Sequence, residues 1–260
     1  MTPVSWNNGP DIADDRGFIR RRRHDKVNDR SQLARRKYSD RDLRAMTLTF
    51  DPDLAVAALR RRDRTLAKII RQAGPFTHRP QRVQSPFQSL LRAIVYQQLS
   101  GKAAATILGR VVDLCGGQRA FKPDAILAAS EARLRAAGLS RGKTLSVKDL
   151  AAKTLDGTVP TLARLRKMSD DEIVERLIAV RGIGRWTVEM LLIFRLGRPD
   201  VLPLGDFGVR KGFMVTYGTA EMPSPAELLA HGERWRPYRS VASWYLWRAV
   251  EIARAAELPG

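Results

Sequence analysis

A Gly-Ile-Gly turn set between two apolar segments constrains the fold of this chain more than any other sequence feature. Apolar residues recur at helical spacing over 172–180, and the same spacing resumes over 185–196. Gly182 and Gly184 interrupt the pattern, because glycine adopts backbone angles that are closed to other residues. The sequence therefore predicts two helices joined by a tight hairpin.

The hairpin has the chemistry of an anion site. Backbone N–H groups at the start of a helix point outward and attract negative charge. Without side chains at Gly182 and Gly184, a phosphate can approach the backbone closely, and Arg181 and Arg185 add positive charge on either side. Taken by itself, however, a G-x-G between helices is more often an ordinary αα-corner.

The charge of the chain favours the phosphate-binding interpretation. Its 260 residues include 46 Lys and Arg against 27 Asp and Glu, which gives a net charge of +19 and a pI near 11.0. This balance indicates a polyanionic partner, with nucleic acid ahead of a membrane surface or an acidic protein. A genome biased toward Arg and Ala is the competing explanation, and charge alone does not separate DNA from RNA.

Asp206 is the acidic residue whose context best suits catalysis. Leu204-Gly205-Asp206 precedes 207–211, which reads as the start of a helix, so a simple N-cap is the alternative role. A helix start also orients a carboxylate and stabilises its charge. Such a carboxylate can stabilise an oxocarbenium-like sugar cation and direct water to it. We expect Asp206 to be the single carboxylate of its site, because Asp200 lies in a polar turn and no other acid has comparably apolar surroundings.

The rest of the composition bounds the class of protein. With 44% hydrophobic residues, the chain can bury a core as one domain or as two tightly joined lobes. Its one cysteine, Cys115, excludes an intrachain disulfide and fits a reducing compartment. No apolar run is long enough to span a bilayer, and the arginines at 20–23 precede no hydrophobic stretch. We therefore expect a bacterial cytoplasmic, nucleoid-associated protein without a membrane partner.

His24, His78 and His231 show no metal-ligand spacing.

Helical patterns dominate, so the sequence predicts an all-α fold. Residues 1–49 are dense in Arg, Asp and Asn, and we expect a basic, largely disordered arm with a short helix around 31–46. A solvated tail without a role is an equally good interpretation of the arm. The folded part is expected over 50–260. Its helices are predicted from Asp51 and over 85–99, 100–115, 123–128, 130–137, 142–154, 161–165, 172–180, 185–196, from 206, and over 223–231 and 237–257.

With hairpin and aspartate placed, the chain resembles the helix-hairpin-helix DNA glycosylase superfamily, and within it the 3-methyladenine DNA glycosylase II (AlkA) branch. The likeness extends over about 50–258, and three segments carry it. They are Pro86-Phe87 with Arg92-Ala93-Ile94-Val95-Tyr96-Gln97-Gln98-Leu99-Ser100 and Ala103-Ala104; Gly182-Ile183-Gly184-Arg185-Trp186-Thr187 with Pro203-Leu204-Gly205-Asp206; and Trp235-Arg236-Pro237-Tyr238-Arg239-Ser240-Val241-Ala242 with Tyr245-Leu246-Trp247-Arg248.

The resemblance implies a monomeric, all-α, two-lobed helical fold with the active-site cleft between the lobes. Residues 1–49 are too short and too charged for the N-terminal β-rich domain of the full branch, so the chain is similar to the shorter members. No cofactor is expected. The single cysteine cannot hold the four-cysteine iron–sulfur cluster of endonuclease III-type relatives.

The resemblance also assigns the reacting residues. The family's catalytic aspartate falls on Asp206. Trp186 stands where bifunctional relatives, which also nick the strand, carry a lysine, so a monofunctional enzyme is implied. Trp186 and Trp247 would form walls of the base pocket, with Met190 on the same side as Trp186. For Trp235 and Trp244 we expect a place in the core instead.

DNA contacts are implied at the hairpin, at the loop 97–99 and at Arg210. The loop matches a segment that inserts a wedge into the space left by a flipped base, and we choose Gln98 over Leu99 as the wedge. In the family, main-chain carbonyls of the hairpin hold a structural Na⁺ or K⁺ against a phosphate. The residues implied are Gln97, Gln98, Leu99, Gly182, Ile183, Gly184, Arg185 and Arg210 for DNA, and the carbonyls of Ile178, Val180 and Ile183 for the cation.

Together these expectations describe a monofunctional N-glycosyl hydrolase of the DNA-3-methyladenine glycosylase II type. It would flip alkylated bases out of double-stranded DNA and excise them, leaving an abasic site for base excision repair. An alkylated purine is cationic and a good leaving group, and stacking on indole adds about 1–2 kcal/mol of cation–π attraction.

Two alternatives remain open: a glycosylase of the same fold for oxidised, deaminated or mismatched bases, and a noncatalytic module that uses the hairpin only to bind DNA.

Overall fold

The computed structural model describes residues 48–80 and 85–257, and helices are the only regular elements among them. The predicted all-α class is confirmed. The elements are α3 (Pro52–Arg62), α4 (Arg64–Ala73), α5 (Pro86–Tyr96), α6 (Gly101–Leu114), α7 (Pro123–Ala128), α8 (Glu131–Ala136), α9 (Arg141–Leu155), α10 (Leu162–Leu165), α11 (Asp170–Ile178), α12 (Arg185–Phe194), α13 (Phe207–Tyr217), α14 (Pro225–Gly232), the 3-10 helix η1 (Glu233–Trp235) and α15 (Arg239–Glu257).

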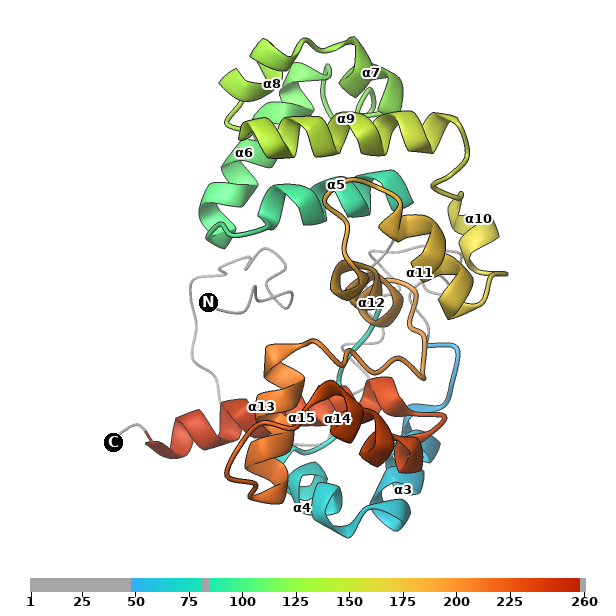
Figure 1. Cartoon of the computed structure of the whole chain (residues 1–260), viewed down its shortest axis with the longest axis vertical. Helices are drawn as coiled ribbons and strands as arrows, with labels where there is room; N and C mark the ends of the chain where they lie inside the picture. The colour runs from blue at the N-terminus through green and yellow to red at the C-terminus, as the bar shows by residue number, and fades with distance from the viewer. Residues whose placement is uncertain (1–47, 81–84, 258–260) are drawn as a thin grey trace, which may run out of the picture.

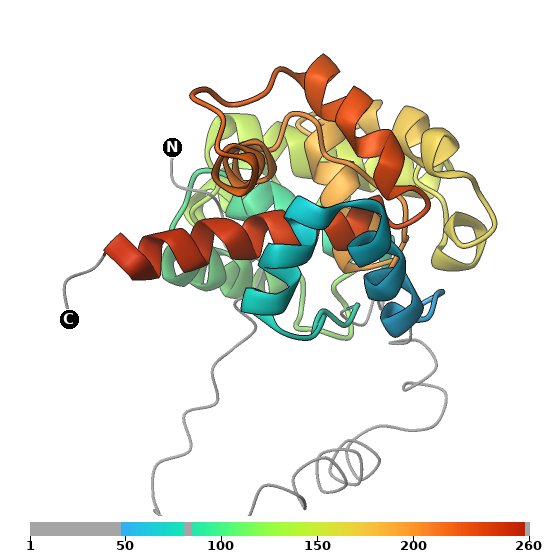
Figure 2. The ribbon, with the colours of Figure 1, turned by 90° about the horizontal axis from the view of Figure 1, so that it is seen from below.

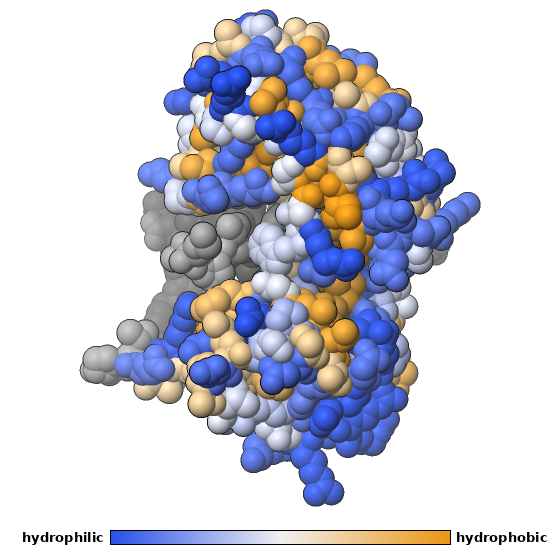
Figure 3. Space-filling view, viewed as in Figure 1, coloured by the Kyte–Doolittle hydropathy of each residue, from blue (hydrophilic) through white to orange (hydrophobic). Residues whose placement is uncertain are grey.

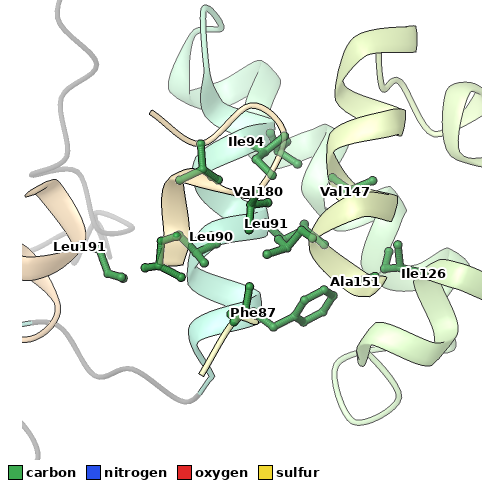
Figure 4. Close-up of a cluster of buried hydrophobic side chains, with 14 of the residues drawn as sticks. Phe87, Leu90, Leu91, Ile94, Ile126, Val147, Ala151, Val180 and Leu191 are labelled. Carbon is green, nitrogen blue, oxygen red and sulfur yellow. The ribbon is translucent and has the colours of Figure 1, made fainter. Parts of the chain in front are cut away.

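The helices form two lobes, each with its own apolar core (Figure 1). The upper lobe consists of α5 to α12, and the lower lobe of α3, α4, α13, α14, η1 and α15. The chain thus starts in the lower lobe, builds the upper lobe and returns. In the upper core, α5 contributes Phe87, Leu90, Leu91 and Ile94, which face side chains from α7 and α9 (Figure 4).

The lower lobe is organised around α15, the long helix of Figure 2, which crosses and packs against α4 and α13. At Gly212 the backbones of α13 and α15 come so close that an added Cβ would lie 2.0 Å from the carbonyl oxygen of Leu246. Only glycine permits this approach. The close packing sets the first turn of α13 beside the middle of α15, and this brings the candidate site together.

Helix starts follow the capping residues in the sequence. Asp51 caps α3, and Ser169 with Glu172 forms a capping box at the start of α11. The predicted helices agree with the observed ones to within one to three residues at most ends. The hairpin at 179–184 separates α11 from α12 as predicted.

Contacts with the folded part begin two residues before the predicted boundary of the arm. Leu48 packs against the lower core, and the Thr49 hydroxyl donates to the Gly197 carbonyl at 3.2 Å. The rest of the predicted arm, with the helix expected around 31–46, lies outside the described residues. None of the described helices has the length and apolar character needed to cross a bilayer. Hydrophilic residues cover most of the face seen in Figure 3, and a hydrophobic band runs across it from the upper lobe to the lower lobe.

Candidate active site

Asp206 lies where the two lobes meet, at the start of α13. Its Oδ1 accepts the Val209 amide at 2.7 Å, so the carboxylate is the N-cap of the helix. The residue is buried, with 8% of its surface exposed. The capping role that the sequence left as the alternative is therefore present. It does not exclude a catalytic role, because the cap uses one oxygen and fixes the orientation of the other.

Two indoles donate hydrogen bonds to the same carboxylate. Trp186 Nε1 donates to Oδ2 at 2.7 Å, and Trp247 Nε1 donates to Oδ1 at 2.8 Å. Trp186 comes from α12 of the upper lobe, whereas Trp247 comes from α15 and packs against the cores of both lobes. Three N–H groups thus complement the charge of Asp206, and the carboxylate links the two lobes.

The structure brings the two predicted pocket tryptophans together. Both are half-buried, and the ring of Phe194 stacks on Trp247 with centroids 5.4 Å apart and an interplanar angle of 26°. Met190 lies one turn beyond Trp186 on α12 and is 2% exposed, within the upper core. Whether these side chains receive a base stays a prediction.

Trp235 and Trp244, in contrast, belong to the core of the lower lobe, where they are 0% and 8% exposed. Their predicted place in the core is confirmed. The two pairs of tryptophans therefore divide between the junction of the lobes and the interior of one lobe.

Gly208 makes room for Trp247 beside the carboxylate, a role that the sequence analysis missed. An added Cβ at this position would lie 2.7 Å from Trp247 Cδ1 and 2.9 Å from its Nε1. A side chain would therefore displace the indole that donates to Asp206. The sequence signal was a glycine two residues after the aspartate, but its meaning depends on α15, about forty residues further on.

To the single carboxylate expected at the site the structure adds a second buried acid, Glu189, whose charge interacts with that of Asp206. This residue lies on α12, is 6% exposed and has the Arg185 guanidinium 3.8 Å away. Burial raises the pKa of Glu189 to about 7; Arg185 opposes the rise and the negative charge of Asp206 adds to it. The signal in the sequence was a lone acid within the apolar segment Arg185–Phe194.

The hairpin has the geometry expected of a phosphate site. Gly182 has a φ of +78°, and an added Cβ would lie 2.7 Å from Ser146 Oγ, so the turn requires glycine. Gly184 is the N-cap of α12 and supplies no side-chain cap. Within the described part of the chain, the amides of Gly182, Gly184 and Arg185 have no acceptor. The Arg185 side chain is 67% exposed beside them.

Helix α9 holds the other side of the hairpin. Asp149 Oδ2 accepts the Arg181 amide at 2.7 Å and the Lys153 ammonium at 2.9 Å. Lys153 also donates to the Ala179 carbonyl at 2.5 Å. Sequence reasoning did not find these two residues, because they precede the hairpin by about thirty positions.

The three carbonyls implied for a cation belong to the same turn. The Val180 carbonyl already accepts the Ile183 amide at 3.0 Å, which leaves one lone pair for an ion. The Ile178 side chain is 47% exposed at the end of α11. The donor set is compatible with a monovalent ion, which prefers neutral oxygen ligands. Over 48–80 and 85–257, no group of three or more His, Cys, Asp or Glu residues is arranged to hold a metal ion.

The loop predicted to carry the wedge presents its three residues differently. Gln98 is exposed at the tip, whereas Gln97 and Leu99 are half-buried. The Gln97 side-chain amide donates to the Gly182 carbonyl at 2.8 Å, so it links the loop to the hairpin. Gln98 is therefore the most exposed of the three residues, and its role as a wedge stays a prediction.

Arg210 lies in the first turn of α13, is half-buried and is partly engaged by the protein. Its Nε donates to the Pro223 carbonyl at 2.8 Å. The residue lines a shallow hollow together with the 52% exposed ring of Phe207, Lys211 and Met214. Two basic side chains, one acidic side chain (Glu221) and several apolar ones thus line a hollow along α13, the helix that Asp206 caps.

Comparison with known proteins agrees with this geometry. Residues 91–237 match the family model described as "HhH-GPD superfamily base excision DNA repair protein". DNA-3-methyladenine glycosylase 1 of Schizosaccharomyces pombe is 35% identical over 74% of this chain and 84% of its own length.

Two solved structures share the fold. The S. pombe 3-methyladenine DNA glycosylase in complex with abasic DNA aligns with a TM-score of 0.66 and 35% identity, over 76% of this chain and 97% of that one. The DNA-3-methyladenine glycosidase of Bacillus halodurans aligns with a TM-score of 0.70 and 37% identity, over 80% and 94%. The predicted resemblance is confirmed, and this chain belongs to the HhH-GPD superfamily of base excision DNA repair proteins.

Proposed function

We propose that this protein is a DNA glycosylase that excises alkylated bases of the 3-methyladenine and 7-methylguanine type from double-stranded DNA, leaving an abasic site. The observation that supports this proposal most directly is the buried carboxylate of Asp206, which accepts hydrogen bonds from the indoles of Trp186 and Trp247. Relatives named as 3-methyladenine glycosylases support the choice of lesion.

The geometry suggests how the reaction proceeds. A base must leave the stack before its glycosidic bond can be reached, and the faces of Trp186 and Trp247 offer surfaces that attract a cationic ring. Asp206 would stabilise the positive charge that develops on the sugar and orient the attacking water. The alkylated base leaves as a neutral molecule, so its departure needs no added proton.

Trp186 supports a monofunctional reaction. A lyase step of the kind found in bifunctional glycosylases needs an amine that forms a Schiff base with the sugar. An indole nitrogen is a donor without nucleophilic character, and here it is hydrogen-bonded to Asp206. We therefore expect the strand to remain intact after the base is released.

DNA would bind as a monomeric complex through three elements. The free amides of the hairpin would receive a phosphate, with a Na⁺ or K⁺ on the adjacent carbonyls. Gln98 would fill the space of the flipped base, and the basic surface near Arg210 would follow the strand. These contacts are mostly electrostatic, so affinity should fall steeply with salt concentration.

The deciding experiment is base release from DNA treated with a methylating agent, for the wild type and Asp206→Asn, with the products separated by chromatography. The wild type should release 3-methyladenine or 7-methylguanine, and the variant should be about 100- to 1,000-fold slower. Binding of both proteins to abasic DNA serves as the control for folding. Full activity in the variant would refute the mechanism, whereas release of a different base from a lesion panel would correct the substrate.

A further inference from the structure

The loop between α5 and α6 holds its exposed residue in an uncommon backbone conformation. Among the described residues, Gln98 is the one non-glycine residue with a positive φ, +57°. Residues other than glycine, asparagine and aspartate seldom adopt this left-handed backbone region, so the surrounding structure must hold Gln98 in it.

Lys143, in the first turn of α9, grips this loop from behind. Its ammonium donates to the Val95 carbonyl and to the Gln97 carbonyl, each at 2.7 Å. Both carbonyls lie at the end of α5, where helical C=O groups lack intrahelical partners and attract a cation. The end of α5 and the start of α9 lie at the same side of the upper lobe in Figure 1.

The grip continues into the hairpin. The backbone carbonyl of Gln97 receives Lys143, and the side chain of Gln97 donates to the Gly182 carbonyl at 2.8 Å. Lys143, the loop and the hairpin therefore form one chain of hydrogen bonds. It ends at the two elements that are expected to touch the DNA duplex.

The charge of Lys143 is committed to these carbonyls. Among the ion pairs of the described residues, none includes Lys143. Lys148 on the same helix offers a contrast, because it donates to the Leu127 carbonyl at 3.1 Å, at the far end of α7 and in an exposed position. The two lysines are thus alike in charge and helix but differ in what they hold.

We propose that Lys143 is a positioning residue for base flipping, which presets the loop 97–99 so that Gln98 enters the base stack without rearrangement. The inference rests on the proposed function for the lesion used in the assay. It does not require Lys143 to touch DNA. Its contribution should matter only when a base has to be displaced from a paired duplex.

The test compares Lys143→Met, Lys143→Arg and the matched control Lys148→Met, which changes net charge by the same amount. Single-turnover excision of 7-methylguanine is measured with the lesion paired in a duplex and with the lesion unpaired in a bulge. For Lys143→Met we expect a loss of about 10- to 100-fold on the paired lesion and less than about twofold on the unpaired one. Lys143→Arg should recover most of the rate, and Lys148→Met should equal the wild type.

A second readout needs no excision. A duplex with an abasic-site analogue opposite 2-aminopurine reports entry of the wedge as a change in fluorescence, and Lys143→Met should reduce that change at saturating protein. Equal losses on paired and unpaired lesions, or a full fluorescence change in Lys143→Met, would overturn the proposal. If the wild type releases no 7-methylguanine, the proposed function fails instead, and the fluorescence still decides the role of Lys143.

Discussion

Asp63 in the lower lobe and Asp206 at the junction of the lobes are built in the same way. Each is the N-cap of a helix, with Oδ1 accepting a backbone amide three residues on, from Leu66 at 2.9 Å and from Val209 at 2.7 Å. Each also accepts an indole N–H, from Trp235 at 2.9 Å and from Trp247 at 2.8 Å. The local motif is therefore shared.

The surroundings of the two carboxylates differ. Asp63 is 4% exposed, and its remaining donors, the Tyr217 hydroxyl at 2.6 Å and His231 at 3.3 Å, belong to the same lobe. Burial alone would raise the pKa of Asp63, but the hydrogen bonds from His231, Leu66, Tyr217 and Trp235 hold it well below its usual range. This carboxylate is saturated with donors inside one core.

Asp206 instead draws its donors from both lobes and has the second acid, Glu189, nearby. A buried carboxylate that is repelled by a second buried acid is not optimised for stability, and such arrangements are typical of functional sites. An N-cap aspartate bonded to an indole thus has a structural role where one lobe supplies every donor. At the junction of two lobes, the same motif is available for a catalytic role.

The largest expected difference is in stability. Asp63→Asn should lower the free energy of unfolding by about 3–4 kcal/mol, because an amide cannot accept from all four donors and leaves some of them unpaired. Asp206→Asn should change it by less than about 1 kcal/mol, since losing the charge also relieves repulsion with Glu189. Urea denaturation at pH 7 measures both.

In the wild type, the stability that Asp63 contributes should be present above pH 3.8, the ordinary pKa of an aspartate, and be lost as the pH falls below it. A larger loss of stability in Asp206→Asn than in Asp63→Asn would show that Asp206, and not Asp63, is the structural carboxylate.

A second, smaller effect concerns Glu189 and has the opposite pH dependence. Because its pKa rises from 4.5 to about 7 on folding, the folded state binds more protons than the unfolded state between these values. Stability should therefore fall as the pH rises through this window. Glu189→Gln should abolish that fall and be about 1–3 kcal/mol more stable than the wild type at pH 8, with little difference at pH 4.5.

Thermal unfolding across the range pH 4.5–8 would reveal the effect of Glu189. Glu175→Gln, on the exposed side of α11, is the matched control for loss of one carboxylate. A wild-type profile with no slope in this window would mean that Glu189 is ionised in the folded protein.

The smallest effect tests the space beside Asp206. Gly208→Ala should displace Trp247 and slow excision about tenfold, because the carboxylate loses a donor and the pocket loses a correctly placed wall. Gly205→Ala lies one residue before Asp206 with no atom within 4 Å of an added Cβ, and it should retain the wild-type rate. Single-turnover kinetics separates the two, and equal rates would remove Gly208 from the site.

Much of this protein follows from local sequence. The turn at Gly182 and Gly184, the capping box at Ser169 and the helical spacing of apolar residues each act within a few positions, so the all-α class and most helix ends could be predicted. The local context singled out Asp206, the resemblance to a family added Trp186 and Trp247, and the structure brings these three side chains together.

Only the tertiary structure decided which local features meet. Glu189, Gly208 and Lys143 owe their roles to partners that are distant in the sequence, such as the Gln97 carbonyl for Lys143 and Trp247 for Gly208. Asp63 and Asp206 carry the same capping signal, and although the apolar surroundings singled out Asp206, the donors that each carboxylate receives depend on the packing of distant helices. Capping and periodicity are properties of one helix, whereas burial, charge and donor supply depend on how helices pack against one another.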